Sequence, residues 1–314
     1  YAMTERRETG RGRNIGPARN KSKAAPEAKW EDGERIAKYL AHAGICSRRE
    51  AETLISEGKV MVNGERLDSP AVKVTARDQI KVRGKIVRPP EATRMWMYHK
   101  PAGLITATRD PEGRPTIFDH LPKSLPRVVT VGRLDLTTEG LLLLTNDGEL
   151  ARKMELPATG LERHYRARAH GRVTPEALEE LKKGVIVDGV EYASIDATLE
   201  RTTGTNNWLH VILREGKNRE VRKALASVGL TVNRLIRIKY GPFELAELAS
   251  GTLEEVPAEQ LARILGEEIR TQRMSQAPER PQRGQRQNSS RGGPRSGGPP
   301  GRRPGGQKKR PPRR

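Results

Sequence analysis

The residues best suited to chemistry lie in a short polar segment between two apolar runs, VVTV and LLLLT. This segment, residues 132–140, contains Arg133, Asp135 and Glu139. A carboxylate held in such a loop could act as a general base or as a nucleophile. Asp135 could equally be an ordinary turn carboxylate, and the segment alone leaves both interpretations open.

Other uses of these carboxylates are disfavoured. The spacing of Asp135, Glu139 and Asp147 matches no calcium-binding loop, and Asp147-Gly148 is better explained as a turn. A glycosidase would require a second positioned carboxylate, for which Glu139 is a weak candidate. The single cysteine, Cys46, excludes an intrachain disulfide and a zinc site with several cysteines. We therefore expect no metal site, and we expect Cys46 to lie in a core.

The distribution of charge indicates a polyanionic partner. The chain has 314 residues and a net charge of +20. Residues 1–29 carry 8 Lys/Arg against 3 Glu, and residues 271–314 carry 13 Lys/Arg against 1 Glu. Each Lys or Arg that neutralises a phosphate releases condensed counterions, which favours binding to nucleic acid. An anionic membrane surface is the competing partner. The sequence has no apolar run of about 18 residues and no signal-peptide core, so we expect a cytoplasmic protein without a membrane partner.

The segment before the Asp135 region is predicted to form a small unit of helices and strands. Apolar residues recur at helical spacing from Ile36 to Ala41. Ser47 and Glu50 form a capping box that starts a second helix. Strands are predicted at 59–62 and 79–82, and Asn63-Gly64 is a hairpin turn.

From residue 95 onward, short strands with a few helices predict an α+β domain around a mixed or antiparallel sheet. Thr174-Pro175 starts one helix and Gly184 ends it, a second helix begins near Asn218, and a third spans about 257–267. The strand-like runs are MWMYHK, VVTVGRL, LLLLT, HYRARA, WLHVIL and LIRIKY. The whole chain divides into a disordered basic arm (1–29), a small domain (30–87), a linker (88–94), a larger domain (95–269) and a disordered Arg/Gly/Pro-rich tail (270–314).

The small domain resembles the S4 RNA-binding domain, notably in RIAKYLAHAGICSRREAETLISEGKVMVNG. Such domains present their second helix to RNA, where basic side chains and the helix N-terminus meet phosphates. The alternative is a solvated charged face. The resemblance implies RNA contacts for Arg35, Lys38, Ser47, Arg48, Arg49 and Lys59.

The larger domain resembles the RsuA/RluB-type pseudouridine synthases, which modify uridines in ribosomal RNA. GRLD followed by TTEGLLLLTNDG is similar to their catalytic motif, and KPAGLITATRD, ERHYRARAHG and EGKNREVRKAL follow the expected order along the chain. The resemblance covers roughly residues 34–250. It implies an S4 domain followed by a pseudouridine synthase domain that acts as a monomer on free or pre-ribosomal RNA and uses no cofactor.

The resemblance also assigns roles to individual residues. Asp135 would be the catalytic carboxylate, Tyr165 would pack on the target base, and Arg222 would be the basic partner of Asp135. Such a partner is physically needed because an ionised Asp in a closed pocket is costly, and a guanidinium can bind it with two parallel hydrogen bonds. The remaining substrate-binding candidates are Arg133, which would enter the vacated base stack, Leu225, which would line the pocket, and Lys217, Asn218, Arg219 and Lys223.

Two routes to the product remain open. Asp135 either attacks C1′ of the nucleotide or removes the 2′ proton to leave a glycal. The form EGKNREVRK and the basic tail favour the branch that acts on large-subunit ribosomal RNA near the peptidyl transferase centre. The alternatives are a small-subunit enzyme and a non-catalytic RNA-binding or ribosome-assembly protein.

Overall fold

The structure is a computed structural model that describes residues 33–265. The predicted disordered arm at 1–29 and the predicted tail at 270–314 lie outside the described residues. Within the described range, a small group of elements up to Ile86 precedes a larger α+β sheet domain that begins at Met95. The predicted fold class is therefore confirmed.

The small unit is built from two helices and short strands, as its sequence predicts. The capping box is confirmed, because the Ser47 hydroxyl accepts from the Glu50 N–H at 3.1 Å and the Glu50 carboxylate accepts from the Ser47 N–H at 2.7 Å. Cys46 is buried in its core, also as predicted. The elements are α1 (Ile36–His42), α2 (Arg48–Ser56), β1 (Glu34–Arg35), β2 (Val60–Val62), β3 (Glu65–Arg66), β4 (Lys73–Val74), β5 (Ile80–Val82) and β6 (Lys85–Ile86).

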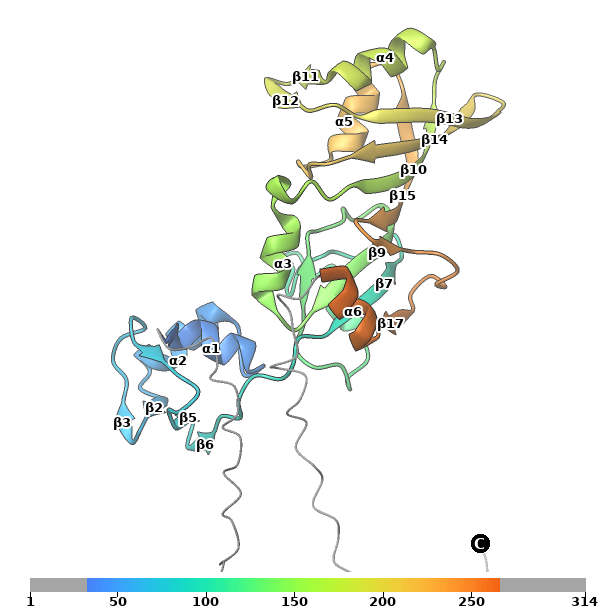
Figure 1. The fold of residues 1–314 in the computed structure, drawn as a ribbon. Helices are drawn as coiled ribbons and strands as arrows, with labels where there is room; N and C mark the ends of the chain where they lie inside the picture. Colours follow the sequence, from blue (N-terminus) through green and yellow to red (C-terminus); the bar gives the residue numbers. More distant parts are fainter. Residues whose placement is uncertain (1–32, 266–314) are drawn as a thin grey trace, which may run out of the picture. The chain divides into compact units, whose positions relative to one another are not determined.

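A nine-stranded mixed sheet is the centre of the larger domain (Figure 1). Its main order is β13-β14-β10-β15-β9-β7-β17, and β15 and β9 pair in parallel while the other neighbours are antiparallel. The strands are β7 (Met95–Lys100), β8 (Val129–Val131), β9 (Thr138–Thr145), β10 (Arg163–His170), β13 (Asp196–Thr203), β14 (Asn206–Leu213), β15 (Thr231–Tyr240), β16 (Phe243–Glu244) and β17 (Leu253–Glu255).

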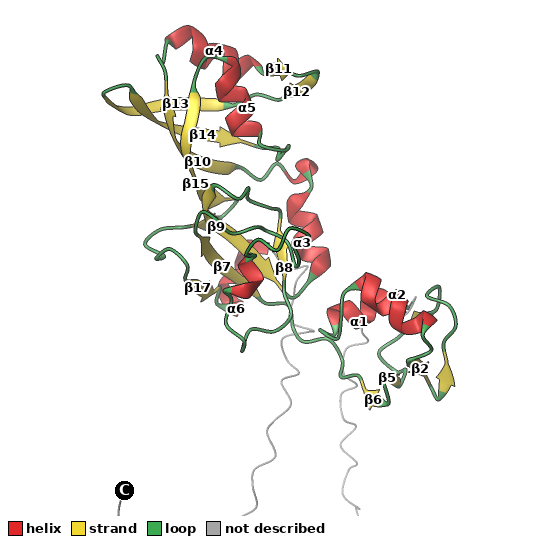
Figure 2. Cartoon of the chain, turned by 180° about the vertical axis from the view of Figure 1, so that it is seen from behind, coloured by secondary structure: helices red, strands yellow, loops and turns green. Residues whose placement is uncertain are grey.

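Helices and one hairpin complete this domain (Figure 2). The predicted cap of α4 is confirmed, since the Thr174 hydroxyl accepts from the Ala177 N–H at 3.2 Å. The interpretation of Asp147-Gly148 as a turn is wrong, because Asp147 caps a helix through bonds from the N–H groups of Glu149 and Leu150. The elements are α3 (Gly148–Glu155), α4 (Pro175–Lys183), α5 (Glu220–Ser227), α6 (Ala258–Leu265), the hairpin β11 (Val185–Val187) and β12 (Val190–Tyr192), and 3₁₀ turns at Ile117–Asp119 and Pro157–Thr159.

Strand β9 is buried on both faces, which explains its continuous run of leucines. Leu142 and Leu144 pack in one apolar cluster, whereas Leu141 and Leu143 pack in another on the opposite face. Gly140 has φ +103°, and a Cβ there would lie 2.2 Å from the Arg237 carbonyl oxygen. Only glycine therefore lets β9 approach β15 in parallel pairing. This arrangement fixes the start of β9, where the loop with Asp135 ends.

Candidate active site

The loop with Asp135 joins β8 to β9 and is held by backbone contacts. The Thr106 hydroxyl donates to the Leu134 carbonyl at 2.8 Å and accepts from the Leu134 N–H at 3.3 Å. The Thr138 N–H donates to the Asp135 carbonyl at 3.0 Å. The Asp135 side chain remains 28% exposed. The loop thus fixes the backbone of Asp135 while leaving its carboxylate accessible to a substrate.

A buried lysine also holds this loop. It was not among the site residues predicted from the sequence. Lys100 is fully buried, and its ammonium donates to the carbonyls of Pro101 at 3.0 Å, Leu136 at 3.4 Å and Thr138 at 2.9 Å. Burial lowers the pKa of Lys100 to about 8, against the raising effect of Asp135 and Glu139. The sequence did contain one indication of this role, because Lys100 is the first residue of KPAGLITATRD, a segment that resembles the pseudouridine synthases. Lys100 therefore positions the loop without reaching the substrate.

The cation that pairs with Asp135 is Arg219. Its Nη1 lies 3.5 Å from Asp135 Oδ2. The expectation that Arg222 binds this carboxylate through two hydrogen bonds is wrong, because Arg222 donates to the carbonyls of Val232 at 3.1 Å and Thr137 at 3.4 Å. The physical reason is that α5 begins at Glu220, and Arg219 is its N-cap with φ +51°. Arg219 thus lies just before the helix that carries Arg222, with a backbone conformation outside the helical range.

Arg222 still contributes to the electrostatics of the site. Burial lowers its pKa, the neighbouring Arg219 lowers it further, and Asp135 raises it. Its Nε is buried without a hydrogen-bond partner in the described chain. Two guanidinium groups therefore act on the Asp135 carboxylate, one through an ion pair and one at longer range.

Apolar residues of β10, of α5 and of the Asp135 loop itself are buried. Tyr165 of β10 is 8% exposed, Leu225 of α5 is fully buried, and Leu134 directly precedes Asp135 in the chain. All three belong to one buried cluster. The predicted aromatic and the predicted pocket residue thus share a cluster with the residue that precedes Asp135. A flat base could pack on such a surface.

The remaining residues predicted to contact the substrate differ in whether they are exposed or already bound within the protein. Arg133 and Asn218 are exposed, and Lys223 is partly exposed. Lys217 is occupied, because its ammonium donates to the Glu191 carbonyl at 2.6 Å and pairs with Glu215 at 2.8 Å. Lys217 therefore anchors the 215–219 loop to the β11–β12 hairpin.

A pair of carboxyl groups underlies that loop. Glu220 is only 3% exposed, and its Oε2 accepts from the Lys217 N–H at 2.8 Å. Burial, and to a lesser extent Glu215, raise the pKa of Glu220 to about 7. Glu215 accepts from the Ala193 N–H at 2.8 Å. Glu220 therefore lies directly beside the residue that pairs with Asp135 and holds a proton through much of the acid range.

Replacing Glu220 by Gln is expected to remove a pH dependence of stability. The folded pKa near 7 exceeds the ordinary 4.5, so the wild-type protein loses stability as pH rises from 4.5 to 7. Gln does not ionise, so the variant should be more stable by about 1 to 2 kcal/mol at pH 8 and match the wild type near pH 4.5. Urea unfolding at both pH values measures the difference. The exposed Glu179→Gln of α4 is the control and should shift neither value; equal curves for wild type and Glu220→Gln at pH 8 would contradict the assignment.

The predicted RNA contacts of the small unit differ in their availability. Arg35, Arg48 and Arg49 are exposed. Lys59 pairs with Glu57 at 2.6 Å. The remaining two are engaged, because Lys38 pairs with Glu34 at 2.8 Å and also contacts Glu149, and Ser47 caps α2. Arg35, Arg48 and Arg49 are thus the exposed members of the set that form no ion pair within residues 33–265, and two of them lie at the start of α2.

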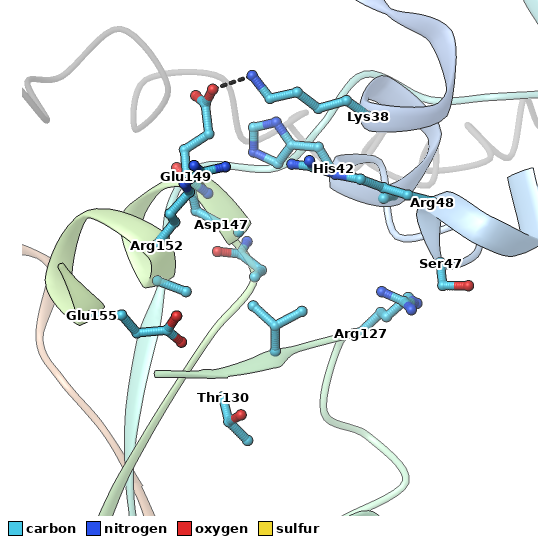
Figure 3. A pocket seen from close by; sticks show the side chains of 15 residues that line it. Lys38, His42, Ser47, Arg48, Arg127, Thr130, Asp147, Glu149, Arg152 and Glu155 are labelled. Atoms are coloured by element: carbon cyan, nitrogen blue, oxygen red, sulfur yellow. Dashed lines mark hydrogen bonds and ion pairs between the residues drawn. The ribbon is translucent and has the colours of Figure 1, made fainter. Parts of the chain in front are cut away.

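Figure 3 shows a pocket of about 360 Å³ whose lining includes Lys38, Arg48, Arg127 and Glu149. Asp135 is not among its lining residues, so this pocket is separate from the candidate active site. Within residues 33–265, no group of three His, Cys, Asp or Glu side chains is placed to hold a metal ion. The described helices also include none with the length and apolar character needed to cross a bilayer.

Two family models match the chain. Residues 34–80 match the S4 domain, and residues 94–227 match the family described as RNA pseudouridylate synthase. The first match covers most of the small unit, and the second covers the part of the sheet domain from β7 to α5, which includes Asp135. They cover both parts of the described chain in the order that the sequence predicts.

Similar proteins agree with these matches. An uncharacterised RNA pseudouridine synthase of Rickettsia felis is 46% identical over 223 residues, which cover 71% of this chain and 96% of that protein. The ribosomal large subunit pseudouridine synthase B of Haemophilus influenzae is 41% identical over 270 residues, covering 81% and 75%. That of Pseudomonas aeruginosa is 43% identical over 244 residues, covering 76% and 63%. A crystal structure of a pseudouridylate synthase superposes with a TM-score of 0.52 at 25% identity, covering 73% and 99%.

Proposed function

Because the chain belongs to the RNA pseudouridine synthase family, with an S4 domain before its catalytic domain, we propose that it converts a uridine of large-subunit ribosomal RNA to pseudouridine. The observation that carries this proposal is the ion pair between Asp135 and Arg219 at the edge of the apolar cluster with Tyr165. The relatives named ribosomal large subunit pseudouridine synthase B support the large subunit over the small one. We place the uridine near the peptidyl transferase centre.

In the proposed reaction, the target uridine leaves its stack and packs on Tyr165. Extrusion costs a few kcal/mol, which the aromatic contact and an Arg133 side chain in the vacated stack would offset. Asp135 then breaks the bond between C1′ and N1 by attack on C1′ or by removal of the 2′ proton. The freed base rotates and C5 bonds to C1′. In the first route this step breaks the bond between Asp135 and C1′, and in the second a proton returns to C2′. C5 then loses its proton and N1 gains one, which completes the isomerisation. This chemistry balances without a redox group or a cofactor.

Each part of the chain has a proposed task. The S4 domain at 30–87 binds RNA through Arg48 and Arg49, and the linker at 88–94 connects it to the catalytic domain at 95–269. Arg219 holds the Asp135 carboxylate through the ion pair, Arg222 adds a second positive charge nearby, and Leu225 lines the base pocket. The protein acts as a monomer in the cytoplasm on free or pre-ribosomal RNA.

The test is to map pseudouridines in ribosomal RNA from cells that lack this protein. We expect one site of the large-subunit RNA to lose its pseudouridine and to regain it when the wild type is added back. Asp135→Asn should not restore it. Loss of a small-subunit site would support the alternative substrate, and an unchanged map would support a non-catalytic RNA-binding role.

A further inference from the structure

The strands β13, β14 and β10 have one covered face and one open face. Their inward side chains, such as Ala167 and Val211, belong to the cluster that contains residues of α4 and α5. These helices gather at one side of the strands in Figure 1. Strand alternation sends Arg166, Arg168 and Trp208 to the opposite face. None of the buried apolar clusters of residues 33–265 includes Trp208.

Trp208 supports arginines on this open face. The guanidinium carbons of Arg166 and Arg201 lie 5.1 and 5.9 Å from its ring centroid. Arg168 lies opposite Trp208 in the register of β10 and β14, and its Nε donates to Asn233 Oδ1 at 2.7 Å. A guanidinium over an indole ring is attracted to it, while its N–H groups remain free to reach an anion. The ring therefore orients cations on an uncovered surface.

The charges of the open face are not balanced. Arg166 pairs with Glu200 at 2.7 Å. Arg168 and Arg201 have no carboxylate within ion-pair distance in the described chain. Three arginines thus face one glutamate around an aromatic ring. Arginines combined with an aromatic side chain are the pattern that proteins use for RNA backbones and unstacked bases.

We propose that this surface, formed by Arg166, Arg168, Arg201 and Trp208, binds the phosphate backbone of an RNA segment that flanks the target nucleotide. The segment is distinct from the reacting uridine, because Tyr165 and the Asp135 loop lie on the opposite face of the same sheet. The surface therefore adds affinity for long RNA and does not take part in the chemistry. This role goes beyond the isomerisation itself.

The test compares Arg168→Gln/Arg201→Gln with wild type in the full-length protein. Binding is measured over a series of salt concentrations, with a long large-subunit ribosomal RNA transcript and with a short stem-loop that contains the mapped uridine. We expect the double variant to bind the long RNA about 5- to 10-fold more weakly and the slope of log affinity against log salt to fall by about 1 to 2. Affinity for the stem-loop and its rate of conversion should stay unchanged.

Lys182→Gln/Lys183→Gln on α4 removes the same charge from exposed positions and is the matched control. It should leave the affinity for long RNA unchanged. Unchanged affinity and salt slope in the Arg168/Arg201 variant would overturn the proposal, as would an equal loss on the stem-loop. Loss of binding to pre-ribosomal particles with normal RNA affinity would also overturn it, in favour of a protein partner. Failure of the proposed function is recognised separately, because the wild type would then bind RNA without converting it.

Discussion

An Asp135→Asn variant is expected to bind RNA as the wild type does and to lose at least about 10³-fold in the rate of pseudouridine formation. Asn has the same shape, but it is neither a base nor a nucleophile, so both routes at C1′ stop. The loop should stay folded, because its anchors are backbone contacts from Thr106 and Lys100. The measurement is single-turnover conversion of a radiolabelled stem-loop, together with the affinity for the same RNA.

Glu139→Gln is the matched control for this variant. Glu139 lies four residues further on, but its carboxylate pairs with Arg234 at 2.8 Å instead of facing the site cations. We expect Glu139→Gln to retain most of the activity. Conversion by Asp135→Asn at the normal rate would remove the basis of the mechanism, and equal losses in both variants would point to a general charge effect.

A Lys100→Met variant is expected to lose both stability and turnover. Met fills a similar volume, but the carbonyls of Pro101, Leu136 and Thr138 would lose their buried donor. Leaving these groups unsatisfied should cost about 2 kcal/mol or more, even after relief of the buried charge. Because Leu136 and Thr138 lie within three residues of Asp135, we expect a fall in kcat of about 10- to 100-fold through a misplaced carboxylate.

The loss of turnover in Lys100→Met should occur without a loss of RNA binding. RNA affinity and KM should change little, since Lys100 is fully buried and cannot touch the RNA. Lys183→Met, which changes an exposed lysine of the same domain, should change neither turnover nor the urea midpoint. A Lys100→Met enzyme that turns over at the wild-type rate would show that the loop is positioned without this ammonium.

Local signals in the sequence predicted much of the fold. The Ser47/Glu50 capping box and the Thr174 cap each involve side chains that satisfy nearby backbone groups, so their effect is visible within a few residues. Strand β13 (Asp196–Thr203) was missed because DATLERTT shows little apolar alternation, and its pairing with β14 holds it in place. Helix α3 was missed because its Asp147 cap also fits a turn.

The assignment of Asp135, Tyr165 and Leu225 to the site stays a prediction from the motifs. In the structure, Tyr165 and Leu225 share one buried cluster with Leu134, the residue before Asp135. The sequence predicted Arg222 as the ion-pair partner of Asp135, whereas the structure shows Arg219 in that role. This difference depends on the left-handed backbone at position 219, which the spacing of residues on a continuous helix does not reveal. Lys100 acts through tertiary contacts with carbonyls 36 and 38 residues away, and no local pattern encodes those.

The parallel pairing of β9 with β15 has a consequence during biosynthesis. Residues 138–140 pair with residues 235–237, so the start of the Asp135 strand depends on chain that is synthesised about 100 residues later. Small local units fold early as the chain emerges, whereas this long-range contact must wait. A nascent chain shorter than about 240 residues can therefore display a folded RNA-binding module while its reaction centre is still unassembled.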